Sequence, residues 1–108
     1  MEELELSSQV LQRIVDRITE VAHPNRLILF GSCAKGKIGK ESDVDILVVV
    51  HNSANRGELA MKIYRNLHGL SIPVDVVVVT EDDILKYRGK IGTILYPALN
   101  EGIVVYEA

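Results

Sequence analysis

The stretch that decides the fold of this chain is LILFGSCAKGKIGKESDVDILVVV, at residues 27–50. It begins with four apolar residues and ends with a second apolar run at 44–50, and such runs are typical of buried strands. Between the runs, glycine at positions 31, 36 and 39 is interleaved with serine and lysine. This composition predicts a loop. The stretch therefore predicts two buried strands joined by a glycine-containing loop.

The residues on either side of this stretch predict helices. Apolar residues at helical spacing predict an amphipathic helix at about 8–22. A second helix is expected after the second strand, with Asn52 or Ser53 as its cap and Gly69 at its end. Tyr64 falls on the apolar stripe of this second helix, so it is expected in the core.

The C-terminal part predicts further elements of both kinds. Residues 72–79 are expected to form a third strand, and 103–106 a last one. Thr80 and Asp83 have the spacing of a capping box, so a helix is expected to begin between these two strands. Alternating helices and strands predict an α/β (α+β) fold, with helices packed on a small sheet. We expect a single domain over residues 1–108.

Composition and charge are typical of a globular domain. The chain has 108 residues, of which 47% are apolar and 25% are charged. Its net charge of −3 argues against direct nucleic-acid binding, which usually requires a basic face. Cys33 is the single cysteine, so no internal disulfide is expected. No apolar run approaches the ~20 residues that a membrane span needs, so we expect no membrane contact and a cytoplasmic protein.

Three aspartates lie within or directly before apolar strands, where carboxylates are costly: Asp43, Asp45 and Asp75. Strands disfavour aspartate, and a buried carboxylate destabilises a fold unless it is paired or binds a metal ion. Asp43 and Asp45 are two residues apart, so an extended chain directs both to one face, about 6–7 Å apart. We expect Asp75, from a neighbouring strand, to complete the cluster.

A divalent cation would remove the repulsion among these three carboxylates. Ligands that are all oxygen favour Mg²⁺ or Mn²⁺ over zinc, and the spacing of Asp43 and Asp45 suits a pair of cations about 3.5–4 Å apart. The alternative is structural, with Asp43 ending a turn and Asp75 paired with an arginine. The position of Asp-Val-Asp directly after a glycine loop favours the metal site, whereas for Asp75 both interpretations stay open.

The loop after the first strand is a candidate phosphate-binding segment. Gly31 lets the main chain approach a phosphate closely, Ser32 adds a hydroxyl and Lys35 adds positive charge. A glycine and a serine after a strand more often form an ordinary turn. Residues 31–37 also match the start of a P-loop, but Ile38 stands where that motif needs Ser or Thr to hold Mg²⁺. The P-loop interpretation is therefore rejected.

Taken together, the loop and the aspartates resemble a known family. GSCAKG at residues 31–36, followed by SDVD at 42–45, is similar to the signature of the DNA polymerase β-like nucleotidyltransferases. The leading helix, PVDV at 73–76 and EGIVVYE at 101–107 resemble the minimal nucleotidyltransferase (MNT) antitoxins of that superfamily. The resemblance implies the nucleotidyltransferase fold, in which helices pack on a small mixed β-sheet like that of the polymerase β palm.

The resemblance also implies a role for each residue of the motifs. Four residues are expected to bind the nucleotide: Gly31, Ser32, Lys35 and Ser42. Asp43 and Asp45 would bind both metal ions, while Asp75 would bind the catalytic one and help to deprotonate the attacking hydroxyl. Lys35 stands where arginine is common in the family, and lysine keeps the charge but not the bidentate fork.

A protein partner is implied in the same way. Members of this branch are similar to antitoxins that are encoded beside helical HEPN-domain ribonuclease toxins, which they neutralise by adenylylating a tyrosine. Too few residues follow the third strand to form the helical acceptor-binding domain of larger superfamily members. We therefore expect ATP as the nucleotide and a second chain as the acceptor, in a homo- or hetero-oligomer.

Two other functions stay open at this point. One is a non-catalytic, nucleotide-binding antitoxin or regulatory module, although retention of all three aspartates argues against it. The other is a small-molecule, antibiotic-type adenylyltransferase, which the missing acceptor-binding domain disfavours. The main prediction is a Mg²⁺-dependent enzyme that transfers AMP from ATP to a hydroxyl of a partner protein.

Overall fold

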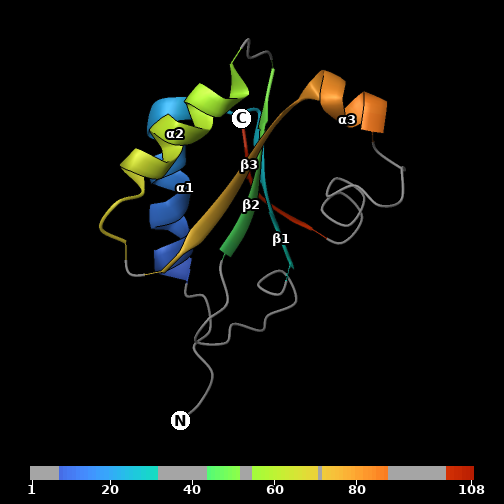
Figure 1. The fold of residues 1–108 in the computed structure, drawn as a ribbon. Coiled ribbons are helices and arrows are strands. Elements are labelled where there is room, and N and C mark those ends of the chain that lie inside the picture. Colours follow the sequence, from blue (N-terminus) through green and yellow to red (C-terminus); the bar gives the residue numbers. More distant parts are fainter. Residues whose placement is uncertain (1–7, 32–43, 52–54, 71, 88–101) are drawn as a thin grey trace.

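The computed structural model describes residues 8–31, 44–51, 55–70, 72–87 and 102–108, and Figure 1 shows how their elements are arranged. Along the chain these elements are α1 (Ser8–Ala22), β1 (Arg26–Phe30), β2 (Val44–Val50), α2 (Arg56–Asn66), β3 (Val74–Thr80), α3 (Glu81–Tyr87) and β4 (Ile103–Glu107). The predicted bounds of α1 and β2 agree with the structure, and the other strands differ from the prediction by one or two residues at their ends. No helix of the described residues is long and apolar enough to cross a membrane.

The four strands of the described residues form one mixed sheet in the order β3-β2-β1-β4. β2 and β3 are parallel, while β1 is antiparallel to both of its neighbours, β2 and β4. The connection from β2 to β3 contains α2, because parallel strands need a crossover of this kind. The mixed sheet with its helices confirms the fold class predicted from the sequence.

The sheet separates two apolar layers, since successive residues of a strand point to opposite faces. Figure 1 shows α1 and α2 on one side of the sheet and α3 on the other. The main core lies under α1 and α2 and includes Ile14, Ile18, Leu27, Val44, Ile46, Val48 and Ile63. On the other face, Ile84 of α3 belongs to a smaller cluster with Ile28, Phe30, Leu47, Val49 and Val79. We call these the helix-covered face and the α3 face.

Hydrogen bonds as well as apolar contacts join α1 to α2. Arg17 Nη1 donates to the main-chain oxygen of Asn66 at 2.9 Å, and Asn66 Nδ2 donates to the main-chain oxygen of Arg17 at 2.7 Å. Arg17 thereby satisfies a carbonyl at the C-terminal end of α2, where carbonyls lack helical partners. The two helices are held as one layer over the sheet.

The start of α2 corrects the predicted cap. The cap is Asn55, whose Oδ1 accepts a hydrogen bond from the main-chain nitrogen of Glu58 at 2.9 Å. Asn52 and Ser53, the predicted caps, lie outside the described residues. Asn55 and Glu58 have the spacing of a capping box, so the signal for the true cap was present in the sequence.

Tyr64 also corrects a prediction, because it does not lie in the core. The residue is 41% exposed, and its hydroxyl accepts a hydrogen bond from the main-chain nitrogen of Val76 at 2.8 Å. Among the strands that the structure describes, β3, which contains Val76, lies at the edge of the sheet. Tyr64 therefore satisfies a main-chain group at an edge that would otherwise be open to pairing.

The N-terminus of α3 confirms the predicted capping box. The main-chain nitrogen of Asp83 donates to Thr80 Oγ1 at 3.1 Å, and that of Thr80 donates to Asp83 Oδ2 at 3.0 Å. Arg56 Nε donates to Asp83 Oδ2 at 2.8 Å and so connects the starts of α2 and α3. The Arg56 guanidinium, followed by the Thr80 main-chain donor, holds the pKa of the Asp83 carboxyl below its ordinary value.

Candidate active site

Two of the predicted aspartates are strand partners. Asp45 is the second residue of β2, Asp75 is the second residue of β3, and the two pair across the parallel ladder. Paired residues of neighbouring strands direct their side chains to the same face, with backbones about 4.8 Å apart. That face is the α3 face, because Leu47 and Val49 follow Asp45 at strand spacing and belong to its cluster. The structure thus brings the two carboxylates together.

The end of β1 lies beside this pair. Phe30 is the antiparallel partner of Asp45, and Gly31 follows it directly. β1 runs opposite to β2 and β3, so its end meets their starts at one end of the sheet. Gly31, Asp45 and Asp75 therefore come together from three adjacent strands, although Asp75 is distant from the other two in the sequence.

Asp45 and Asp75 are accessible although their strands are buried. Every residue of β2 is buried except Asp45, which is half-buried, and Asp75 is exposed. Val44 and Ile46 flank Asp45 in the sequence, belong to the main core on the opposite face and are 0% exposed. The two aspartates are thus carried by a backbone whose neighbouring residues are buried, as preorganised sites require.

Gly31 is needed for two reasons that the structure makes explicit. Its φ is +76°, in the left-handed region that favours glycine. A Cβ added at this position would overlap the Oδ2 atom of Asp45 and lie 3.3 Å from its Cγ. A side chain at position 31 would therefore displace the carboxylate of Asp45. The sequence suggested only that glycine admits a phosphate; the steric link to Asp45 depends on the pairing of β1 with β2.

The two carboxylates suit a hard divalent cation. Like charges directly opposite each other destabilise a sheet, and a cation between them removes the repulsion. Oxygen ligands are those that Mg²⁺ prefers. The described residues contain no group of three His, Cys, Asp or Glu side chains placed to hold a metal ion. A third carboxylate would have to come from outside them, and Asp43 is the predicted one.

Four of the predicted site residues lie outside the described residues: Ser32, Lys35, Ser42 and Asp43. Their roles stay predictions. The structure places the other three, Gly31, Asp45 and Asp75, at one end of the sheet.

Phe30 is a neighbour of the site that sequence reasoning treated only as the last residue of a strand. It is the partner of Asp45 and lies on the α3 face, with 8% of its surface exposed. Phe30 therefore places an apolar side chain on the same face as Asp45, on the neighbouring strand. An aromatic residue directly before Gly31 was the available signal, but its relation to Asp45 required the strand register.

Comparisons with known proteins identify a matching family and similar structures. The model of the nucleotidyltransferase domain family matches residues 8–98. A crystal structure from Sulfolobus solfataricus, of a protein provisionally assigned as a nucleotidyltransferase, is similar to this chain with a TM-score of 0.61 and 20% identity, over 92% of this chain and 78% of that one. The poly(U) polymerase Cid1 with MgGTP bound gives a TM-score of 0.42 and 14% identity, over 74% of this chain and 35% of its own. A search of curated proteins found no match.

The Sulfolobus structure shows that the fold is shared. The family model spans both the glycine loop and the three predicted aspartates, and the fold of the family implies a nucleoside triphosphate as substrate. The class of activity is therefore nucleotidyl transfer. Because the family model matches most of its length, this chain belongs to the nucleotidyltransferase domain family, as a minimal member of the polymerase β-like superfamily.

Proposed function

We propose that this nucleotidyltransferase is Mg²⁺-dependent and transfers AMP from ATP to a hydroxyl group of a partner protein. The observation that carries the proposal is the pairing of Asp45 with Asp75 beside Gly31. Asp45 and Asp75 lie opposite each other on neighbouring strands, and two carboxylates in this arrangement supply the oxygen ligands that a divalent cation prefers. The arrangement is understandable if a metal ion occupies it during the reaction.

Asp45 and Asp75, with Asp43 as the predicted third ligand, would hold Mg²⁺, or Mn²⁺ in its place. When bound, the metal ion neutralises the triphosphate and stabilises the charge that develops on the leaving pyrophosphate. The Asp45 carboxylate lies so close to Gly31 that a Cβ added there would overlap its Oδ2 atom. This close packing would fix the orientation of the Asp45 oxygens before the substrate arrives.

The triphosphate itself is proposed to lie along the loop that begins at Gly31. Gly31 has a positive φ and lies against the Asp45 carboxylate. Main-chain N–H groups in such a turn, together with Ser32, Lys35 and Ser42, would bind the phosphate oxygens. Phosphates would thus reach the carboxylate pair from the β1 side.

The exposed position of Asp75 suits a role in proton transfer. In the proposed step, the acceptor hydroxyl loses its proton to the Asp75 carboxylate while its oxygen forms a bond with the α-phosphorus. The bond from the α-phosphorus to the bridging oxygen breaks, and pyrophosphate leaves with that electron pair. AMP remains esterified to the acceptor, and Asp75 releases its proton to solvent. Positioning and charge stabilisation would supply most of the rate.

We further propose that the acceptor is a tyrosine of a helical HEPN-type ribonuclease toxin, which the chain would neutralise as an antitoxin. This part of the proposal, like the choice of ATP, is supported by the resemblance of residues 31–36 and 42–45 to those of the MNT antitoxins.

Label transfer tests the proposed function. ATP labelled at the α-phosphate is incubated with Mg²⁺, the full chain and the purified product of the neighbouring gene. We expect label on that protein and release of unlabelled pyrophosphate, with no transfer from γ-labelled ATP. Asp75→Asn should abolish transfer, whereas Asp82→Asn, the same exchange at an exposed position of α3, should not. A stable complex without any transfer would contradict the proposal and favour a masking antitoxin.

A further inference from the structure

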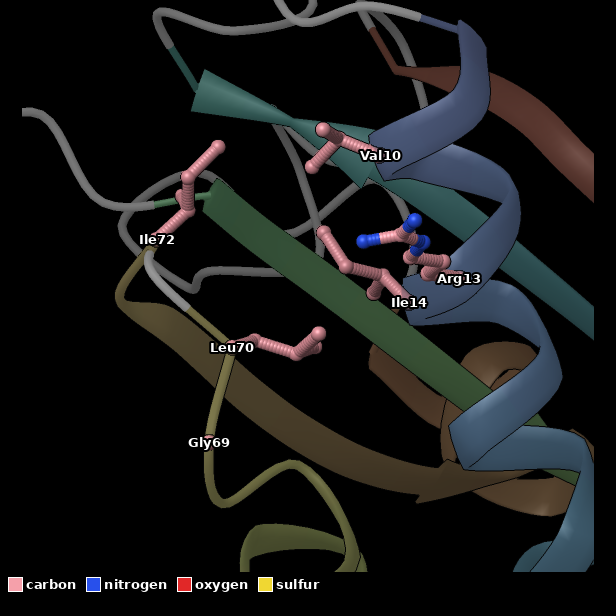
Figure 2. Close-up of a pocket in the computed structure, with 6 residues that line it drawn as sticks. All are labelled: Val10, Arg13, Ile14, Gly69, Leu70 and Ile72. Carbon is pink, nitrogen blue, oxygen red and sulfur yellow. The ribbon is translucent and has the colours of Figure 1, made fainter.

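A small pocket opens beside α1 on the helix-covered side of the sheet (Figure 2). The residues that line it are Val10, Arg13, Ile14, Gly69, Leu70 and Ile72. Its volume is about 120 Å³. A cavity of roughly 150 Å³ lined by similar side chains holds benzene in another protein. The pocket therefore has room for one branched aliphatic side chain.

Arg13 is the one charged residue of this pocket, and it makes no hydrogen bond or ion pair within the described residues. Arg17, one turn further along α1, differs in this respect, because it donates to the main-chain oxygens of Asn66 and His68. Figure 2 shows the Arg13 guanidinium extending from α1 toward the space that Leu70 and Ile72 border. An available guanidinium beside an apolar hollow favours a ligand that combines an aliphatic group with a carboxylate.

The pocket lies at the same end of the sheet as the carboxylate pair. Leu70 and Ile72 belong to the segment that leads into β3, and Ile72 precedes Asp75 by three residues, about 10 Å along an extended chain. Within that segment, the main-chain oxygen of Pro73 accepts a hydrogen bond from the nitrogen of Val44 at 2.9 Å. The wall of the pocket is therefore attached to both strands that carry the aspartates.

We propose that this pocket docks a segment of the acceptor protein in which an aliphatic side chain lies next to an aspartate or glutamate. The aliphatic side chain enters between Val10, Ile14 and Leu70, and the carboxylate pairs with Arg13. Docking there holds the acceptor at the end of the sheet at which Asp75 also lies. This inference rests on the proposed function, since it assumes that the acceptor is a protein.

A pair of small probes tests the chemistry of the pocket without requiring catalysis. The ¹⁵N-labelled full chain is titrated with 4-methylpentanoate and, separately, with its neutral analogue 4-methylpentanamide. We expect saturable shifts at the amides of Val10, Arg13, Leu70 and Ile72, with the carboxylate binding about threefold to fivefold more tightly than the amide. Arg13→Gln should remove that difference, whereas Lys62→Gln, which removes a charge from the exposed face of α2, should retain it. Equal affinity of the two probes, or no shifts around the pocket, would overturn the proposal.

The acceptor assay then connects the pocket with the reaction. With the neighbouring-gene product as acceptor, Arg13→Gln should raise the KM for that protein about fivefold and change the KM for ATP much less, and Lys62→Gln should change neither. Transfer by Arg13→Gln with the wild-type KM would overturn the docking site and leave the proposed function intact. No transfer by the wild-type protein would overturn the proposed function, and with it the assignment of the pocket to an acceptor.

Discussion

On the helix-covered face of the sheet, β2 presents Val44, Ile46, Val48 and Val50, all of them buried. On the α3 face the same strand presents Leu47 and Val49, which are also buried, but begins with Asp45. One face is thus apolar along its whole length, whereas the other changes from apolar to acidic at the end of the sheet. In the sequence, the acidic residue Asp45 lies directly between Val44 and Ile46 of the apolar face.

The difference separates the residues of β2 that stabilise the fold from the residue of β2 that belongs to the candidate site. A carboxylate on the helix-covered face would lie in the main core under α1 and α2, where its desolvation is costly. At the start of β2 on the α3 face, Asp45 is only half-buried, so the cost of desolvating its carboxylate is smaller. Substitutions on the two faces should therefore affect different measurements.

Among the substitutions that compare the two faces of β2, Asp45→Asn should have the largest effect. The exchange keeps the shape of the side chain and removes its charge, so we expect nucleotidyl transfer to fall by on the order of 10²–10⁴-fold. The free energy of unfolding in the absence of metal should change by less than about 1 kcal/mol. Transfer kinetics and urea unfolding check the two expectations, and a large loss of stability would show that Asp45 is structural instead.

The adjacent residue should show the opposite pattern. Ile46→Ala creates a cavity in the main core and should lower the free energy of unfolding by about 2–5 kcal/mol. Well below its lowered melting temperature, the variant should retain the affinity of the wild type for the Mg²⁺–nucleotide complex. If Ile46→Ala weakened that affinity as strongly as Asp45→Asn does, the separation of the two faces would be wrong.

Gly31→Ala should lower both the stability of the fold and the affinity for the Mg²⁺–nucleotide complex. Alanine at the positive φ of position 31 costs about 1–2 kcal/mol of stability. The added Cβ also displaces the Asp45 carboxylate, so the affinity for the Mg²⁺–nucleotide complex should fall as well. Gly69→Ala is the matched control: its φ is +94°, but an added Cβ meets no atom within 4 Å. We expect it to lose stability without losing Mg²⁺–nucleotide affinity. Equal losses of affinity in both variants would refute the steric link to Asp45.

The smallest effect concerns the attachment of α3. The pKa of Asp83 lies below its ordinary value of 3.8, chiefly because of Arg56, so the pair stabilises the fold above that pH and stops doing so as the pH falls through the lowered pKa. Arg56→Gln should cost about 0.2–1 kcal/mol near neutral pH, and this difference from the wild type should disappear in acid. Urea unfolding from neutral pH into acid tests this.

Lys62→Gln is the control for that series, because the ion pair of Lys62 with Glu58 is 3.8 Å long and both side chains are more than half exposed. The free energy of unfolding of Lys62→Gln should be almost the same as that of the wild type at any pH. A penalty for Arg56→Gln that stayed constant into acid would show that its effect does not depend on the charge of Asp83.

Elements with a strong hydrophobic period were predictable from the sequence. α1 and β2 agree with their predicted bounds because the apolar spacing of each covers its whole length. β3 begins at Val74 rather than at residue 72 because Pro73 has no N–H for the ladder, although its carbonyl still binds Val44. The predicted cap of α2 and the predicted burial of Tyr64 were wrong because single hydrogen bonds decide both. Asn55 accepts one from Glu58, and Tyr64 accepts one from Val76.

The site was predictable in its residue types but not in its geometry. Aspartates within apolar strands are unusual enough to single out Asp45 and Asp75. Their pairing depends on which strands are neighbours and in which register, and these follow from the packing of α2 and of the whole sheet. The steric contact between Gly31 and Asp45 likewise depends on the pairing of β1 with β2.

The central claim is that Asp45 and Asp75 act together as one metal–nucleotide site. The measurement that tests it most directly is a double-mutant cycle on the affinity for Mg²⁺ with α,β-methylene-ATP, determined by calorimetry. Each of Asp45→Asn and Asp75→Asn should weaken binding by about 10–100-fold. The double variant should lose little more than either single one, because one carboxylate alone does not complete the site, and Asp82→Asn should bind like the wild type. Losses that add in the double variant, as for two independent sites, or wild-type affinity in that variant, would contradict the claim.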